Sequence, residues 1–218
     1  MKLKSNSNIA ILCLLGSAIF GYNTALAESQ AQIPLVAQKP DLSRAVLTPQ
    51  DLPPGFTEPS PTELASMRNS FSGNEIEPNS LFQLTNTVDI SQFQIIIGGT
   101  FIATPEGVAI VELPLNAQKL LEGISGGVED GVGQYQGINL GRQQLQELTN
   151  LGKIGEFSAG ATRVMKMSGL PVRTELVVFK QGKVLAWVIV GYLEGGKPLI
   201  PLADIARKLD SRILQLAR

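Results

Sequence analysis

The chain has 218 residues, with 18 lysines and arginines against 19 aspartates and glutamates, no histidine and one cysteine. The absence of histidine excludes Ser-His-Asp and Cys-His catalysis and leaves only oxygen ligands for a metal ion once the cysteine is also removed. The net charge is −1, and −3 without residues 1–27, which carry two lysines and no acid; a charge this small steers neither nucleic acid nor acidic lipid. We therefore predict no cofactor, no metal site and no nucleic-acid partner.

Residues 1–27 have the pattern of a secretory signal peptide. Two lysines precede an apolar run from Ile9 to Phe20, and Ala25-Leu26-Ala27 forms a cleavage motif. The run is shorter than the roughly 20 residues that a membrane span needs. We expect cleavage, which also removes Cys13, with retention as an N-terminal anchor as the alternative. The mature chain is then expected in the periplasm or thylakoid lumen, without a transmembrane span.

Residues 28–46 are polar and rich in glutamine, so we expect a flexible lead before a single domain over residues 47–218. The domain opens with LTPQDLPPGF at residues 47–56. Pro54-Gly55 suits the centre of a type II turn, in which glycine takes a positive φ. We interpret this stretch as a latch that binds its own domain, with a partner-binding motif as the alternative.

A short helix is expected after this stretch. Ser60, Pro61 and Glu63 have the spacing of an N-cap, a first-turn proline and a capping box. Leu64, Met67 and Phe71 then mark its apolar face. Three β-rich runs follow, over residues 82–89, 91–103 and 107–114.

Residues 115–133 return to helical spacing, with Gly123, Gly127 and Gly131 in one stripe. The stripe predicts close packing on a sheet, with a partner groove or a kink as alternatives; a phosphate loop is excluded because no Gly-Lys-Ser/Thr follows. After it, residues 137–140 are expected to form a short strand. Residues 141–150 are expected to form a loop or a helical turn.

The last third predicts three antiparallel strands joined by turns at Ser168-Gly169 and Gln181-Gly182. This register places Met165 opposite Val172 and Val178 opposite Leu185. Two apolar sets result. One set is Met165, Met167, Leu176, Val178, Leu185, Trp187 and Ile189. The other is Val164, Val177, Phe179, Val184, Ala186, Val188 and Val190. An antiparallel sheet with one wet face alternates apolar and polar residues, so we expect this sheet to be covered on both sides.

The chain ends in an amphipathic helix. Its apolar stripe is Leu202, Ile205, Leu209, Ile213 and Leu216. We expect this helix on one face of the sheet and the glycine-striped or the capped helix on the other. The predicted fold is therefore α+β, a three-layer α/β/α sandwich around a central antiparallel sheet.

Three charged residues of the hairpins are candidate contacts for a ligand or partner, together with the glycine stripe. Arg173 and Glu175 share one strand face beside Thr162, so they are expected to form either a structural ion pair or a ligand-gripping pair. Arg163 falls on the other face, opposite Thr174. It is interpreted either as a lone cation for an anionic ligand or as an arginine that reaches solvent.

Taken together, the signal peptide, polar lead, hairpin-rich sheet and closing helix resemble the PsbP-like α/β/α sandwich over residues 47–218. DLPPGF at residues 51–56, and FKQGKVLAWVIVGY followed by LADIARKLDSRI, are similar to the ends of secreted bacterial sensor-type domains, including those of actinobacterial kinases. This resemblance implies secreted domains that bind or scaffold. It carries no metal or photosystem partner over to any residue of this chain.

We therefore expect a secreted, non-enzymatic binding or accessory domain, sensor-like or scaffolding, with an envelope or lumenal protein as its partner. Two alternatives stay open. One is a carrier of a small apolar ligand, which requires an apolar cavity. The other is a histidine-free hydrolase or lyase that uses carboxylates and arginine, which requires Arg173, Glu175 or Glu156 to converge on a cleft.

Overall fold

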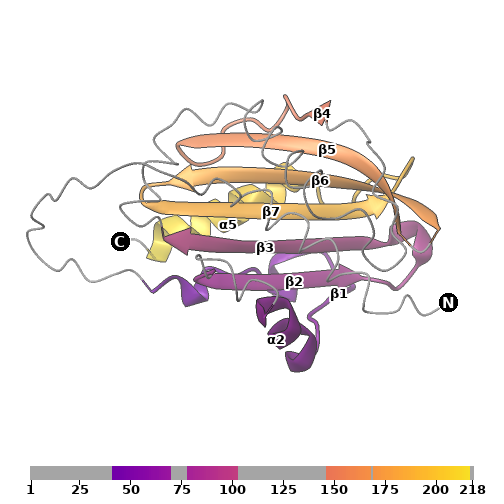
Figure 1. Cartoon of the computed structure of the whole chain (residues 1–218), viewed down its shortest axis with the longest axis horizontal. Coiled ribbons are helices and arrows are strands. Elements are labelled where there is room, and N and C mark those ends of the chain that lie inside the picture. The colour runs from indigo at the N-terminus through magenta and orange to yellow at the C-terminus, as the bar shows by residue number, and fades with distance from the viewer. Residues whose placement is uncertain (1–40, 70–77, 103–145, 168, 217–218) are drawn as a thin grey trace, which may run out of the picture.

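The computed structural model describes residues 41–69, 78–102, 146–167 and 169–216. These residues form a seven-stranded antiparallel sheet with two α-helices, an α+β arrangement, as the sequence predicts (Figure 1). Several expected features lie outside the described residues. They are the signal peptide, Phe71, the strand over 107–114, the short strand over 137–140, and the glycine stripe of Gly123, Gly127 and Gly131.

The sheet has the strand order β1-β2-β3-β7-β6-β5-β4, and every neighbouring pair is antiparallel. The strands are β1 (Phe56–Thr57), β2 (Ser80–Asn86), β3 (Gln94–Ile102), β4 (Gln146–Glu147), β5 (Phe157–Met167), β6 (Leu170–Gln181) and β7 (Val184–Leu193). The α-helices are α2 (Pro61–Asn69) and α5 (Leu202–Leu216), and the 3-10 turns are η1 (Leu42–Arg44), η2 (Pro49–Asp51) and η3 (Ile90–Gln92). Strand β4 shows that a helical turn at Gln146–Glu147 is wrong.

The β5–β6 register is the predicted one, but the β6–β7 register is shifted by two residues. Val178 lies opposite Trp187, and the prediction that it faces Leu185 was wrong. The reason is that the turn is Gly182-Lys183, with Gly182 at a φ of +58°. Because side chains alternate with a period of two, this shift leaves every residue on its predicted face.

Both faces of the sheet are apolar and buried. On the side of α5, the strand residues of what we call the helix-side cluster include Val177, Phe179, Val184, Ala186, Val188 and Val190. On the opposite side, what we call the methionine-side cluster includes Met165, Met167, Val172, Leu176, Val178, Trp187, Ile189, Ile95 and Ile97. The polar-out alternation of a one-sided sheet is thus missing on the central strands.

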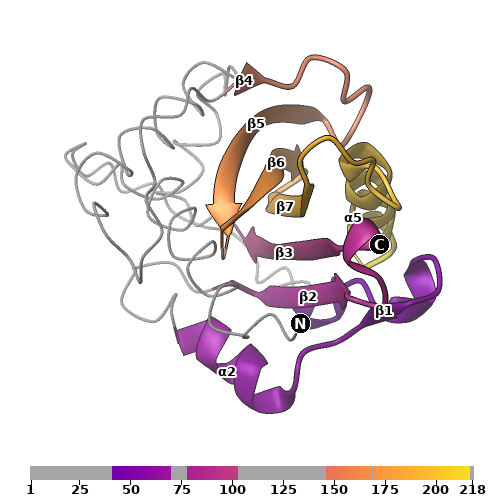
Figure 2. The same cartoon turned by 90° about the vertical axis from the view of Figure 1, so that its right-hand side faces the viewer.

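The two helices contribute to different clusters. Helix α5 lies behind the sheet in Figure 1 and to one side of it in Figure 2. Four residues of its predicted stripe are fully buried in the helix-side cluster: Leu202, Ile205, Leu209 and Ile213. Helix α2 begins with the predicted capping box, because Glu63 N–H donates to Ser60 Oγ and Ser60 N–H donates to Glu63 Oε2. Its Met67 is buried in the methionine-side cluster.

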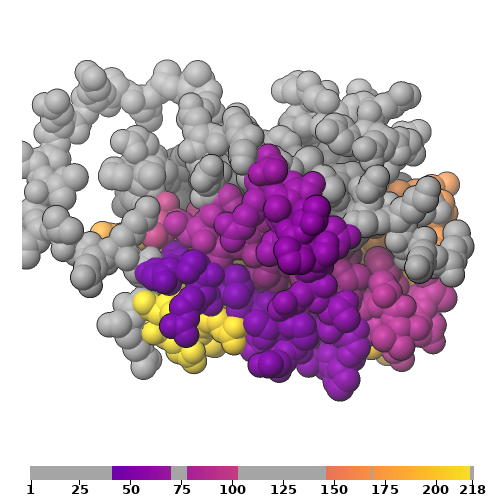
Figure 3. Space-filling model, turned by 90° about the horizontal axis from the view of Figure 1, so that it is seen from below, coloured from indigo at the N-terminus to yellow at the C-terminus, as the bar shows by residue number. Residues whose placement is uncertain are grey.

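The segment that leads into β1 packs against α5. We call residues 42–56, which extend the predicted latch of residues 47–56 toward the N-terminus, the latch. Leu42, Ala45 and Leu47 are all buried in the helix-side cluster. The packed region therefore extends to the N-terminal side of Leu47, where we expected the domain to begin. Figure 3 shows this segment, in indigo, beside the yellow α5. Gly55 has the expected positive φ, at +104°.

Asp51 is the polar centre of the latch. Its Oδ2 accepts the backbone N–H of Thr48 at 2.8 Å, and its Oδ1 accepts Arg212 Nη2 of α5 at 2.7 Å. Arg212 also donates to the carbonyl of Val46. Burial raises the pKa of the Asp51 carboxyl, but the hydrogen bonds from Thr48 and the Arg212 charge outweigh it and hold this pKa below its ordinary value.

Replacing this carboxylate should destabilise the domain. We expect Asp51→Asn to lower the free energy of unfolding by about 1–3 kcal/mol at pH 7, because charge-assisted hydrogen bonds are lost. The pKa is depressed in the folded state, so this contribution is present above the unfolded carboxyl's pKa of about 3.9 and is lost as the pH falls below it. Urea unfolding of wild type and variant at pH 7 and pH 3 measures the difference.

A matched control is Asp204→Asn. Its carboxylate pairs with Arg207 on the same helix at 2.6 Å, and both side chains are about half exposed. Such exposed pairs contribute about 0–1 kcal/mol. The role assigned to the latch is contradicted if the two variants lose the same free energy of unfolding at pH 7. It is also contradicted if the loss in Asp51→Asn is no smaller at pH 3 than at pH 7.

Candidate functional site

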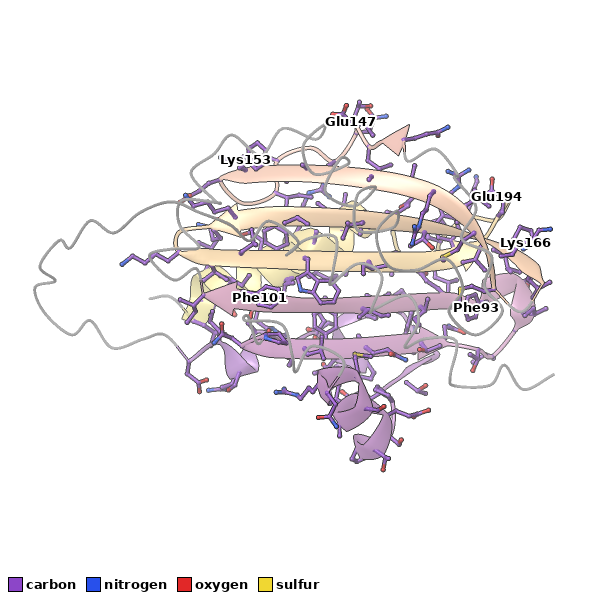
Figure 4. The ribbon with its side chains drawn as sticks, in the orientation of Figure 1. Phe93, Phe101, Glu147, Lys153, Lys166 and Glu194 are labelled. Carbon is purple, nitrogen blue, oxygen red and sulfur yellow. The ribbon has the colours of Figure 1, made fainter. Side chains whose placement is uncertain are left out.

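A polar cluster lies on the helix-side face, at the end of the sheet where Figure 4 labels Glu194. Arg173 donates from Nε and Nη2 to the two carboxylate oxygens of Glu194, at 2.8 and 2.7 Å. Tyr192 donates its hydroxyl to Glu175 Oε1 at 2.7 Å. The expected Arg173–Glu175 ion pair is therefore wrong, because each residue has a different partner. Arg173 also donates to Thr162 Oγ1 at 3.3 Å.

The Tyr192 phenol of this cluster keeps its proton firmly. Burial and the hydrogen bond to Glu175 raise the pKa of Tyr192 above its ordinary value. The phenol is therefore neutral at physiological pH and serves as a donor. Because Arg173 is held by a bidentate carboxylate and Glu175 by the phenol, these groups are arranged as structural pairs. None of them lines the groove that is described below.

A different arrangement occupies the methionine-side face. Arg163 on β5 lies directly opposite Thr174 on β6. Arg163 Nη2 and Thr174 Oγ1 are both buried and lack a hydrogen-bond partner within the described part of the chain. Burial lowers the pKa of Arg163 from its ordinary value. The expected position of Arg163, opposite Thr174 and away from Arg173, is confirmed.

Two other buried polar side chains of the sheet, Gln94 and Ser80, have clear partners. Gln94 donates to the Ile200 carbonyl at 2.8 Å and accepts the Leu199 N–H at 2.7 Å. Ser80 donates to the Ala45 carbonyl at 2.8 Å and shares a 2.7 Å hydrogen bond with Thr100. The Arg163–Thr174 pair differs from these side chains, because Arg163 Nη2 and Thr174 Oγ1 are buried without a hydrogen-bond partner among the described residues.

A shallow groove of about 270 Å³ runs along α5. It is lined by Asp51, Arg207, Lys208, Ser211, Arg212 and Gln215. Its arginines are engaged, since Arg212 holds the latch and Arg207 binds Asp204 and the Leu151 carbonyl. None of Arg173, Glu175 and Glu156 lines this groove, so it does not have the convergence that the hydrolase alternative requires. Its polar lining is also unlike the apolar cavity of a carrier.

Exposed apolar side chains gather at the loop between β2 and β3. Val88 is 78% exposed and Ile90 is 52% exposed. The neighbouring turn Pro53–Gly55 is also exposed, and a Cβ added at Gly55 would lie 3.5 Å from Val88 Cγ2. We call Val88, Ile90 and this turn the tip. The loop is held in place, because Val88 N–H donates to Asn86 Oδ1 and Ser91 N–H donates to Asp89 Oδ1.

Several of these residues were not singled out from the sequence. Tyr192 was missed because the β6–β7 register was set two residues short, and the observed register places it opposite Arg173. Glu194 lies in a turn, where periodicity gives no signal. Val88 was expected within the β-rich run over residues 82–89, but β2 ends at Asn86 and leaves it in the loop. Among the described residues, no three acidic, cysteine or histidine side chains are grouped to hold a metal ion. The described helices include none with the length and apolar character of a membrane span.

The Tyr192–Glu175 pair gives a test at alkaline pH. We expect Tyr192→Phe to lower the free energy of unfolding by about 1 kcal/mol at pH 8, through loss of one hydrogen bond. The raised pKa of Tyr192 means that its stabilisation is complete below the unfolded phenol's pKa of about 10 and declines above it. The gap between wild type and variant should therefore shrink from pH 8 to pH 11, as followed by urea unfolding; a constant gap contradicts the assignment.

Comparisons with known proteins add little to this picture. No protein-family model matches the chain, and no curated protein matches it. The PsbP-like resemblance therefore has no support from a family model. Among solved structures, the chain is similar to LpqN of Mycobacterium tuberculosis, which is described as involved in cell envelope biogenesis. The two share 11% identity over 76% of each chain, with a TM-score of 0.31, too low to support a common fold or function.

Proposed function

We propose that this protein is a non-enzymatic binding or accessory module that acts outside the cytoplasmic membrane and docks on a protein partner through the tip. The observation that carries the proposal is the exposure of Val88 and Ile90 on an ordered loop beside the Pro53–Gly55 turn. Apolar groups held outward in a fixed arrangement lower the entropy cost of association. Such groups are the kind of surface expected of an interaction module.

The location is proposed from the sequence of residues 1–27, which has the pattern of a signal peptide. A partner in the periplasm or thylakoid lumen follows from that location. We further propose the three-layer α/β/α arrangement for the whole chain. The supporting observations are the burial of α5 residues in the helix-side cluster and of Met67 from α2 in the methionine-side cluster.

A non-enzymatic role agrees with the state of the charged residues. Arg173 and Glu175, two of the residues that a histidine-free hydrolase would use, are each engaged with another side chain, Glu194 and Tyr192 respectively. General acid–base catalysis needs a group that reaches the substrate with a pKa near the working pH. Glu175 instead accepts the Tyr192 hydroxyl.

The tip can be tested by removing its apolar side chains without changing charge. We expect the double variant Val88→Ser and Ile90→Ser to keep its stability within about 0.5 kcal/mol, because both positions are exposed. Capture of the partner from native envelope extract should weaken about tenfold or more, since burial of each such side chain contributes roughly 1.5–3 kcal/mol. Quantitative pull-down with the mature protein is the measurement.

Leu214→Ser is the matched control. This leucine is 40% exposed on α5, away from the tip, so its loss should leave capture unchanged. The proposal is contradicted if the same partner is captured equally by wild type and the double variant. It is also contradicted if Leu214→Ser reduces capture as strongly, because the effect would then reflect general surface apolarity.

A further inference from the structure

We propose that Arg163 and Thr174 form a binding site for a monocarboxylate that carries an apolar substituent. The site lies on the methionine-side face of the sheet. It is separate from the tip and does not depend on the partner proposed there. Arg163 and Thr174 are a cross-strand pair of β5 and β6, so their side chains rise from the same face side by side.

The first argument is the unmet hydrogen bonding of this pair. Arg163 Nη2 and Thr174 Oγ1 are buried without a partner in the described residues, and Thr174 is only 4% exposed. A buried polar atom left without a partner costs about 1–3 kcal/mol, and more when the group is charged. An acceptor oxygen placed between the two side chains would satisfy both, because each can donate a hydrogen bond.

The second argument concerns the charge of the ligand. Arg163 forms no ion pair with another described residue, and the register places exposed Glu147 opposite Ala161 rather than opposite Arg163. Figure 4 shows Glu147 at the outer edge of the sheet. One guanidinium can neutralise one negative charge, and its planar fork matches the two oxygens of a carboxylate. A phosphate dianion in the same apolar surroundings would need a second cation.

The third argument concerns the rest of the ligand. The neighbours of the pair along the two strands, on the same face, are Ala161, Met165, Val172 and Leu176, and each is at most 4% exposed. A bare anion gains nothing from such surroundings, whereas a hydrocarbon group next to the carboxylate does. Methionine is the residue best able to change rotamer around an inserted apolar group. A fatty or aromatic acid therefore fits this chemistry better than acetate.

The position of the pair also gives an approach from the side. Strand β4 pairs only with Ala161 and Thr162 of β5. From Arg163 onward, the outer side of β5 has no neighbouring strand among the described residues. Arg163 as a residue is only partly buried, although its Nη2 atom is buried. We therefore infer that a carboxylate approaches Arg163 from this outer side of β5.

Decanoate, below its micellar concentration, is the probe for the full-length mature protein. Calorimetric titration and the shift in melting temperature should both show saturable binding to wild type. Acetate, 1-decanol and inorganic phosphate should each bind at least about tenfold more weakly. Acetate lacks the apolar tail, 1-decanol lacks the negative charge, and phosphate lacks both the tail and the carboxylate group. Arg163→Met should weaken decanoate about tenfold or more, and Thr174→Val should weaken it less. Arg207→Met, on α5 and paired with Asp204, should leave binding unchanged.

The unliganded variants separate a binding role from a structural one. A ligand-binding Arg163 predicts that Arg163→Met melts at the same temperature as wild type or higher, because an unsatisfied buried group has been removed. If Arg163→Met does not fold, Arg163→Lys and Thr174→Val are measured instead, and both should bind more weakly than wild type. The proposal is overturned if folded wild type shows no saturable binding, if decanol or phosphate binds as well as decanoate, or if binding is equal in the variants.

Discussion

Strand β7 has almost no contact with water on either of its faces, and the rest of the structure follows from that burial. Val188 is fully buried in the helix-side cluster, and its neighbour Trp187 is 3% exposed in the methionine-side cluster. A strand in this position can keep its backbone satisfied only by pairing along both edges, as β7 does with β3 and β6. Its side chains must then be apolar, or must form hydrogen bonds with other groups of the protein.

Close packing around β7 also explains the two adjacent glycines of β3. A Cβ added at Gly98 would lie 2.5 Å from Phe82 on the helix side, and one added at Gly99 would lie 2.5 Å from the Ser80 carbonyl and 3.3 Å from the Trp187 ring. These distances leave no room for a methyl group without displacing backbone or aromatic rings. Glycine in a strand interior usually weakens the strand, so its presence here marks close approach of large side chains on both faces.

How far the sequence anticipates the structure depends on the range of each interaction. The stripe of α5, the Ser60 capping box and the faces of β5–β7 follow from local spacing, and all are observed. The faces hold even though the β6–β7 register was misjudged, because an error of two residues does not turn a side chain over.

Long-range polar contacts are different, since no periodicity joins Asp51 to Arg212 or Arg173 to Glu194. Arg173 and Glu175 were correctly placed on one face. Their partners were missed because Tyr192 and Glu194 come from β7 and the turn after it. The same reason limits the candidate site: the Arg163–Thr174 opposition was readable from the hairpin, but their lack of partners was not.

The stretch LTPQDLPPGF contains both residues that pack on the domain and residues that are exposed. Leu47 and Phe56 at its ends are buried, and Asp51 at its centre is tied to α5, so most of it binds its own domain. Between those fixed points, Pro53 and Pro54 are exposed, and the adjoining Gly55 lies beside Val88. A turn anchored on both sides cannot move independently of the sheet, so a partner that docks there meets a preformed surface. The latch and a binding role are therefore compatible uses of one short segment, with the latch supplying the rigidity that the exposed turn needs.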